Sequence, residues 1–314
     1  MKAMSLRIAL PLAVLAFIAP SRALAGPKAP GTSEPSAPVV IPAGTVAETY
    51  VISSPGSYIL GGNRSMSDST KHIIQIAAPD VTVDLNGFAL SFPGGTSTEG
   101  SGVHIAAVEN VAVRNGSIIN GITGLYADVG KGLRVSAVRI AGGSTGLHSY
   151  AEDTIVEQCQ ISDASYMGIS ITGNGSTVND SVVSGSGQFG IFAMSHVQIT
   201  GVTVRGGAVG VHIDNFSSLR DSHISDVHGI GLEVTAFAMI HNNHIVDNYG
   251  VAVALSHSND FSGNFVGSTK AFNASHRGVY SGNMNNVLTN NRIIFNGTNI
   301  FGSYVNGGAN ILVP

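Results

Sequence analysis

The stretch "GLYADVGKGLRVSAVRI", from Gly124 to Ile140, is followed by "GLHSYAEDTIVEQCQIS", from Gly146 to Ser162, which restarts the same pattern 22 residues later. Glycines that open a similar Gly-apolar-x-apolar phrase recur with spacings of 22, 22, 22, 22, 20, 21 and 19 residues. They are Gly102, Gly124, Gly146, Gly168, Gly190, Gly210, Gly231 and Gly250. Such a period is typical of repeat proteins, whose units are too small to bury their own apolar side chains.

A second phrase recurs in step with the glycines, as at Val111, Val113 and Ile118, where two alternating apolar residues are followed by another one five positions on. Alternation with a period of two predicts short strands that bury one face. The Gly, Ser, Asn and Asp residues between the phrases predict turns. We therefore expect about three strands per unit, a sharp corner at the opening glycine, and a solenoid in which each strand pairs with its equivalent one coil away.

The unit also carries a family resemblance. The stretch "ISSPGSYILGGNRSMSDSTKHIIQIAAPDVTVDLNGFAL" (Ile52 to Leu90), followed by "NVAVRNGSIINGITGLYA", resembles the right-handed parallel β-helix repeat proteins of the pectin lyase-like superfamily. The resemblance covers nearly all of the chain after about Tyr50. It implies an all-β fold, a single-stranded right-handed parallel β-helix of about ten coils. Leucine-rich repeats have a similar period but need a dominant leucine pattern, which this chain lacks.

The N-terminal residues predict an exported protein. Residues 1–25 read as a signal peptide, in which Lys2 and Arg7 precede an apolar run and "ALA" forms a small-residue cleavage pattern. Residues 26–44 are rich in Pro, Ala and Ser, which predicts a flexible lead-in before a single domain over 45–314. No other run is long enough to span a membrane. We expect the mature protein in the periplasm or outside the cell.

Charge and cysteine usage narrow the possible partners. Without the signal peptide the chain carries 12 basic and 19 acidic residues, which argues against nucleic acid as a partner. Cys159 is the only cysteine, so the exported chain has no internal disulfide, and we expect this thiol in the core.

Two outward rows of side chains are expected along one sheet face, because residues one and three after each glycine should point inward. The first row is His104, Tyr126, His148, Ser170, Phe192, His212, Glu233 and Ala252, and the second is Ala106, Asp128, Tyr150, Thr172, Met194, Asp214, Thr235 and Ala254. Neighbouring coils lie about 4.8 Å apart, so such rows suit an extended polymer better than a small metabolite. A polysaccharide is therefore the predicted partner.

The first row suggests a reaction. Enzymes that remove the proton beside a uronate carboxylate need a base, an acid and a group that neutralises the carboxylate. Tyr126 is expected between His104 and His148, and we predict that His148 and Tyr126 act as the base and acid pair, with His104 as a third catalytic group. The leading hypothesis is a lyase- or epimerase-like enzyme that needs no metal and no other cofactor.

Six further residues are predicted to bind the substrate. Asp128 or Asp214 would orient an adjacent imidazole, and Tyr150 or Phe192 would stack on a sugar ring. His212 and Glu233 would contact the substrate further along the first row.

The competing hypothesis is a non-catalytic carbohydrate-binding or structural surface protein. The chain has no tryptophan and therefore lacks the Trp-Ile-Asp-His type motif of pectate lyases, and it also lacks the polygalacturonase motifs and the Asp-Pro-His-Asp motif of alginate epimerases. No cationic neutraliser is evident beside Tyr126. A glycoside hydrolase is a weaker option, because Asp128 and Asp214 would lie four coils apart, about 19 Å, which is too far for a carboxylate pair.

Other rows and loops have structural interpretations. Outward charges such as Asp84 and Arg114 predict ion pairs between coils, and His223 and His244 lie in consecutive coils, although two histidines alone do not make a metal site. The segments Ser91 to Ser101 and Gly267 to Arg277 are expected to form loops that wall the sheet face. The asparagines near the C-terminus predict tight turns and hydrogen bonds to the next coil.

Overall fold

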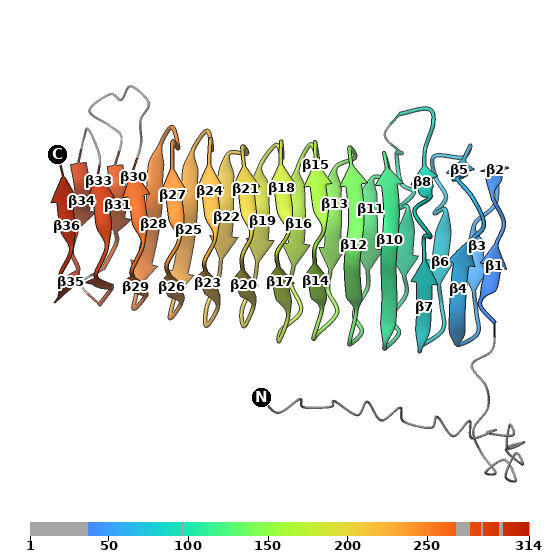
Figure 1. Ribbon diagram of the computed structural model, residues 1–314, viewed down its shortest axis with the longest axis horizontal. Helices are drawn as coiled ribbons and strands as arrows, with labels where there is room; N and C mark the ends of the chain where they lie inside the picture. The colour runs from blue at the N-terminus through green and yellow to red at the C-terminus, as the bar shows by residue number, and fades with distance from the viewer. Residues whose placement is uncertain (1–36, 96, 268–276, 284, 295–297, 314) are drawn as a thin grey trace, which may run out of the picture. The chain divides into compact units, whose positions relative to one another are not determined.

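The computed structural model describes residues 37–95, 97–267, 277–283, 285–294 and 298–313. These residues form a parallel β-helix whose coils follow one another in sequence order (Figure 1). Strands pair in parallel with the equivalent strand of the next coil, as in the register of Leu125 with Leu147 and then Ile169. Within the described ranges no helix has the length and hydropathy to cross a membrane.

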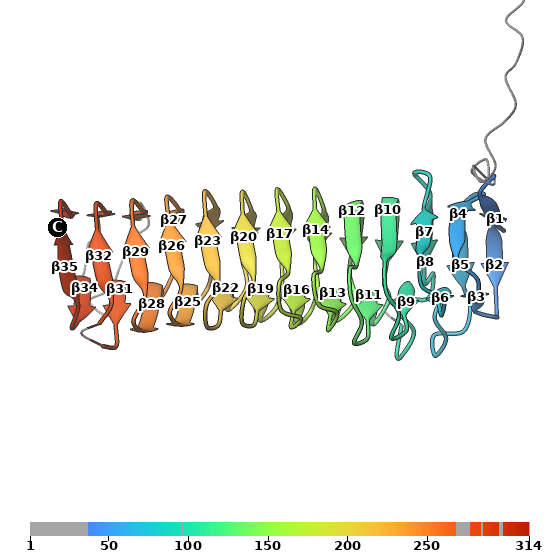
Figure 2. The same cartoon turned by 90° about the horizontal axis from the view of Figure 1, so that it is seen from below.

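One side of the solenoid is a twelve-strand sheet, with one strand from each coil (Figure 2). Its strands are β3 (Tyr50–Ile52), β6 (Ile74–Ile76), β9 (Val103–Ile105), β11 (Thr123–Ala127), β13 (Thr145–Ser149), β16 (Met167–Ile171), β19 (Phe189–Ala193), β22 (Val209–Ile213), β25 (Ile230–Ala236), β28 (Val251–His257), β31 (Arg277–Ser281) and β34 (Thr298–Gly302).

The remaining strands form a 24-strand sheet, to which most coils contribute two strands. They are β1 (Val39–Ile41), β2 (Gly44–Val46), β4 (Gly56–Leu60), β5 (Arg64–Met66), β7 (Val81–Asp84), β8 (Ala89–Ser91), β10 (Val111–Ile119), β12 (Arg134–Ala141), β14 (Ile155–Glu157), β15 (Gln160–Ser162), β17 (Thr177–Asn179), β18 (Val182–Ser184), β20 (Gln198–Thr200), β21 (Thr203–Arg205), β23 (Ser218–Arg220), β24 (His223–Ser225), β26 (Met239–His241), β27 (His244–Val246), β29 (Asp260–Ser262), β30 (Phe265–Gly267), β32 (Val287–Thr289), β33 (Arg292–Ile294), β35 (Val305–Gly308) and β36 (Ile311–Val313).

The all-β fold with about three strands per coil is confirmed, and the number of coils is corrected from about ten to about twelve. The coils that contain β3, β6 and β34 do not open on a glycine phrase, so a count of glycines missed them. Their strands still pair in register with the next coil, as Ile74 does with Val103. Backbone pairing between coils therefore tolerates loss of the glycine at the ends of the solenoid.

The solenoid also begins earlier than the expected boundary at residue 45. Strand β1 pairs with β4, with Val39 opposite Tyr58, and β2 pairs with β5, with Gly44 opposite Arg64. These pairings place the end of the predicted lead-in within ordered sheet. The signal peptide and residues 26–36 lie outside the described residues and stay predictions, as does the loop over 268–276.

The repeated glycine is required by close packing between coils. Gly146 and the next residue, Leu147, are both buried, so the strand bends here and its alternation is broken. A Cβ atom on Gly146 would lie 2.5 Å from Ile161 Cγ2 and 2.6 Å from the Gly168 carbonyl oxygen, distances that non-bonded atoms do not adopt. The expected corner is thus a bend within the strand, and glycine is needed there for space.

One register prediction is wrong. Glu233 pairs with Ala254, whereas Ala252 is fully buried and takes the place of the bend glycine in its coil. The first outward row therefore continues from Glu233 through Ala254 to Tyr280 and Phe301. The 19-residue spacing to Gly250 had shifted the expected row by two residues.

The C-terminal asparagines form the predicted hydrogen bonds between coils. The backbone N–H of Asn243 donates to Oδ1 of Asn264 at 2.9 Å, that of Asn264 to Oδ1 of Asn291 at 2.9 Å, and that of Asn291 to Oδ1 of Asn310 at 3.0 Å. Since these turns are buried, the ladder satisfies donors that water cannot reach. Cys159 is buried in the core, as predicted.

We predict that Gly146→Ala destabilises the solenoid by about 2 kcal/mol or more, because the new methyl group overpacks against Ile161 and the next coil. Chemical denaturation followed by circular dichroism measures the loss. Gly94→Ala is the matched control, since a Cβ there meets nothing within 4 Å, and its effect should stay within about 0.5 kcal/mol. Equal effects of both substitutions would contradict the packing argument.

We predict that Asn264→Ala costs roughly 2–4 kcal/mol, because the backbone N–H of Asn243 loses its acceptor in a buried turn and Nδ2 of Asn243 keeps only the Leu219 carbonyl oxygen. Asn179→Ala is the control, since the Asn179 amide makes only a 3.4 Å hydrogen bond to Thr177. Similar unfolding midpoints for the two variants would contradict the role assigned to the ladder.

Candidate functional site

Four predicted residues come together on the outer face of the twelve-strand sheet. Tyr126 is in register with His104 on one side and His148 on the other, with ring centroids 5.6 Å away in both cases. Tyr150 packs its ring 4.4 Å from that of His148 and 6.1 Å from that of Tyr126. We call these residues, together with Asp128 and His72, the Tyr126 cluster.

Hydrogen bonds orient the histidines at one edge of the Tyr126 cluster. The His104 Nε2 atom lies 3.1 Å from Oδ2 of Asp128, and the backbone N–H of Ser101 donates to Nδ1 of His72 at 3.0 Å. With Nε2–H of His104 donating to Asp128, Nδ1 of His104 is its unprotonated nitrogen in the neutral ring. Asp128 thus contacts an imidazole, which is the geometry that the sequence predicted for it.

Burial reinforces the protonation states that the central pair ordinarily has near pH 7. Burial lowers the pKa of the His148 imidazole, which keeps the ring neutral near pH 7. Burial, followed by the negative charge of Asp128, raises the pKa of the Tyr126 hydroxyl, which keeps its proton. The pair therefore presents a neutral imidazole beside a protonated phenol, the states that a base and an acid need before a proton transfer.

Two polar atoms of the Tyr126 cluster are buried without a hydrogen-bond partner among the described residues. They are Nδ1 of His104 and Nε2 of His148. Such atoms are uncommon in folded proteins, and they mark places where a bound molecule can supply the missing partner. Both lie on the imidazoles that flank Tyr126.

A second group lies further along the same face. Phe192 stacks on His212 with ring centroids 4.9 Å apart and planes 6° apart, and Nδ1 of His212 lies 2.8 Å from Oε2 of Glu233. Glu233, rather than Asp214, therefore contacts this imidazole. Asp214 lies directly after the end of β22 and is half-buried, so it does not share a strand with His212 as predicted. Three coil steps separate His148 from His212, so the two groups are distinct.

A hollow of about 350 Å³ follows the second group and contains Glu233, Arg277 and Tyr280 in its lining. The Arg277 guanidinium lies 3.9 Å from the centroid of the Phe301 ring and 5.7 Å from that of Tyr280. Counted along the register, Tyr280 is seven coil steps from Tyr126, so Arg277 cannot serve the Tyr126 cluster.

Sequence reasoning missed several members of this face. Tyr280 follows the late "GVYSG" phrase at the spacing of the other outward residues, but the expected row ended at Ala252. Arg277 and Phe189 precede their glycines, and this position also faces outward, as the partial exposure of both residues shows. His72 stands before a coil without a glycine phrase, so no repeat signal marked it.

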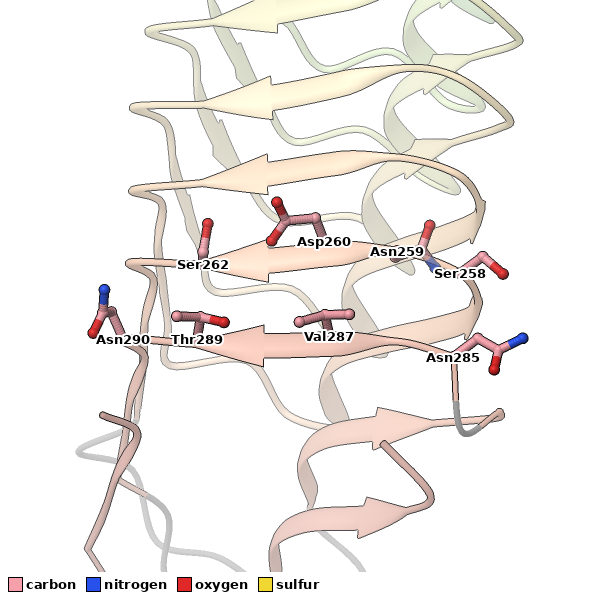
Figure 3. A pocket seen from close by; sticks show the side chains of 8 residues that line it. All are labelled: Ser258, Asn259, Asp260, Ser262, Asn285, Val287, Thr289 and Asn290. Carbon is pink, nitrogen blue, oxygen red and sulfur yellow. The ribbon is translucent and has the colours of Figure 1, made fainter. Parts of the chain in front are cut away.

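The other faces offer weaker sites. Arg114 and Asp84 form the predicted ion pair between coils at 3.0 Å. The Nδ1 atoms of His223 and His244 lie 2.9 Å apart, and within the residues that the structure describes no group of three or more His, Cys, Asp or Glu side chains is placed to hold a metal ion. A polar hollow of about 470 Å³ lies at β29 and β32 (Figure 3).

Comparison with known protein families gives one match. The family model described as periplasmic copper-binding protein (NosD) matches residues 63–198, which is less than half of the chain. The comparison with curated protein sequences gives no match.

Solved structures share the fold. The A-module of the mannuronan C-5 epimerase AlgE6 of Azotobacter vinelandii aligns with a TM-score of 0.64 at 15% identity, over 88% of this chain and 91% of that one. The periplasmic alginate epimerase AlgG aligns with a TM-score of 0.51 at 11% identity, over 84% and 77%. The tailspike of E. coli bacteriophage HK620 in complex with a pentasaccharide gives 0.51 at 12%, over 88% and 60%.

These similarities, with the strand arrangement, confirm the expected parallel β-helix fold. At such identities they concern the fold and leave the roles of single residues as predictions.

We predict that the protein loses stability as the pH falls below about 6.5, the ordinary imidazole value. Since burial lowers the pKa of His148 in the folded state, the unfolded chain takes up a proton more readily, and acid favours unfolding. Burial also lowers the pKa of the His72 imidazole. Melting temperatures of wild type and His148→Gln between pH 7.5 and 5 test this, and the variant should show the shallower slope. Parallel slopes would contradict it.

Proposed function

We propose that this parallel β-helix chain belongs to the pectin lyase-like superfamily, binds a polysaccharide along its twelve-strand sheet and acts on it by lyase- or epimerase-like chemistry at the Tyr126 cluster. The observation that carries the proposal is the placement of Tyr126 between two imidazoles whose unpartnered nitrogens are buried. The fold neighbours that are named as alginate epimerases and as a tailspike with a pentasaccharide support the substrate class.

The proposed step begins with a neutral His148 and a protonated Tyr126. The imidazole takes the proton from the sugar carbon beside the carboxylate. In an elimination the Tyr126 hydroxyl then gives its proton to the departing glycosidic oxygen, while a C–O bond breaks and a C=C bond forms. In an epimerisation the same hydroxyl returns a proton to the opposite face of that carbon. His104, held by Asp128, would contact the substrate carboxylate or hydroxyls.

The remaining predicted residues extend the binding face. Tyr150 is about two-fifths exposed and can stack on a sugar ring, while Phe192 is half-buried and already stacks on His212. His212, Asp214 and Glu233 lie three to four coils beyond His148 and would contact sugars further along the chain. The linear arrangement suits an extended polymer, since each coil adds about 4.8 Å.

A non-catalytic carbohydrate-binding protein is the second candidate, and one observation favours it. Arg277 supplies the guanidinium that lines the hollow on this face, and it lies seven coil steps from the Tyr126 cluster. A uronate carboxylate beside Tyr126 would therefore have to be neutralised by an imidazole rather than by a permanent cation.

Copper chemistry does not follow from the family match. The matched region contains His72, His104, His148 and the buried Cys159, but the described side chains form no group that could hold a metal ion. The thiol of Cys159 has a pKa raised by burial, and it contacts backbone carbonyl oxygens.

The predicted location is the periplasm or the outside of the cell. The family description and the name of the alginate epimerase AlgG both refer to periplasmic proteins, which supports export of this chain. The export signal predicted at residues 1–25 supports the same location.

We expect Tyr126→Phe to lower turnover at least about 100-fold, because the variant keeps the ring and loses the acid. Purified mature protein is incubated with alginate or polygalacturonate, and absorbance reports new unsaturated ends. Deuterium uptake from heavy water reports proton exchange in an epimerase. Tyr166→Phe, an exposed tyrosine before β16, is the control and should retain activity. Turnover that survives Tyr126→Phe would contradict the site, and binding without turnover would favour the second candidate.

A further inference from the structure

An exposed row of aromatic rings follows one corner of the solenoid. His196, Phe216 and Phe237 occupy equivalent positions in three consecutive coils, and His257 lies beside Phe237 in the next. The corner connects the twelve-strand sheet to the 24-strand sheet, since β22 ends at Ile213 and β23 begins at Ser218. We call these four residues the aromatic corner.

The backbone at this corner disfavours such side chains. His196, Phe216 and Phe237 have φ angles of 60°, 58° and 54°, in the left-handed region. Glycine, asparagine and histidine tolerate that region, whereas for the bulky phenylalanines it is an outlier. The same corner carries Gly132, with a φ of 73°, and Gly175, with a φ of 71°, in earlier coils. The chain therefore accepts strain in consecutive coils to place aromatic rings here.

Burial of the rings does not compensate for this backbone strain. Phe216 is 58% exposed and Phe237 is 51% exposed. Their rings are parallel, with planes 6° apart, and the centroids lie 5.1 Å apart. Since atoms in contact approach to about 3.5–4.0 Å, a centroid separation of 5.1 Å means that the rings overlap only in part. Part of each ring face stays open to solvent.

A polar hollow continues the aromatic corner. Ser258, in the corner position of the next coil, lines the hollow of about 470 Å³ together with Asp260 and Asn285. Figure 3 shows Ser258 and Asn285 at the corner where β29 and β32 begin, with Asp260 on β29. Asp260 also contacts Nε2 of His241 at 3.3 Å. Hydroxyl, carboxylate and amide groups thus stand beside the last rings.

We infer that the aromatic corner and this hollow form a second glycan-binding site, separate from the Tyr126 cluster. Aromatic faces pack against the C–H faces of sugar rings, and polar groups nearby bind their hydroxyls. One ring per coil gives a repeat of about 5 Å, which is close to the length of a sugar unit in a chain. The choice of ligand rests on the proposed polysaccharide function, but the site does not depend on chemistry at Tyr126.

The size of the exposed row argues for a glycan over a protein partner. Two half-exposed phenylalanines offer roughly 200 Å² of surface, whereas a stable protein interface buries about 800 Å² on each partner. The row is bordered before Phe216 by the polar residues Asp214 and Asn215, and the exposed side chains of Met194 and Met239 add little to its area. A narrow row of rings beside a polar hollow fits a single extended sugar chain.

The test is the double variant F216N/F237N in the mature protein. Asn fits the left-handed backbone, so the melting temperature of the double variant should equal or exceed that of wild type. Its binding of polysaccharide should weaken about tenfold or more. Native gels that contain alginate, polygalacturonate or dextran measure the binding. F216Y/F237Y keeps the rings and should retain binding. Val129→Asn removes an exposed apolar side chain from the loop after β11 and should change nothing.

Four outcomes overturn the inference. Equal binding by F216N/F237N and wild type removes the site and leaves the proposed function intact. A lower melting temperature with unchanged binding shows that the rings stabilise the fold. A wild-type dimer that F216N/F237N dissociates, measured by sedimentation velocity, identifies a self-association surface. Binding of no polysaccharide by wild type also overturns the second site, while turnover that depends on Tyr126 would keep the proposed function.

Discussion

Successive coils approach each other closely at the bend in the twelve-strand sheet, where the glycine of one coil meets the carbonyl oxygen of the next. At Gly146 there is room for a hydrogen atom and none for a methyl group, because Ile161 and Gly168 already occupy that space. This contact recurs in consecutive coils and holds the strands in register. Since a strand that slips by one residue turns every side chain to the opposite face, the register also determines which residues line the outer surface.

The outer surface follows from that constraint. Side chains two residues after each glycine form one row, and equivalent residues in neighbouring coils are placed next to each other regardless of their identity. Tyr126 lies between two imidazoles, and His212 lies beside Phe192 and Glu233, because the register brings these positions together. Burial then adjusts the chemistry, since it keeps His148 neutral and Tyr126 protonated. The result is a linear surface that matches a linear polymer.

The corners between strands differ in the residues that occupy their left-handed positions. Most left-handed positions are filled by Asn, Asp or Gly, and the buried asparagines that follow some of them carry hydrogen bonds from coil to coil. At Phe216 and Phe237 the same backbone holds exposed rings that a left-handed residue does not favour. Stability explains the asparagines, and binding explains the rings. The two proposed glycan contacts thus occupy different structural features, a sheet face and a corner.

The sequence by itself determined the repeat, the strands, the inward and outward alternation, and the neighbours of Tyr126, because all of these depend on local periodicity and on pairing between equivalent positions. It placed Ala252 wrongly and gave too few coils, because the glycine is absent at these places and only packing shows which residue takes its position. Only the tertiary structure decided that Glu233 contacts His212, that Arg277 lies far from Tyr126, and that the rings at Phe216 and Phe237 are exposed. Those features depend on how side chains from different coils share space, which a pattern along one chain does not contain.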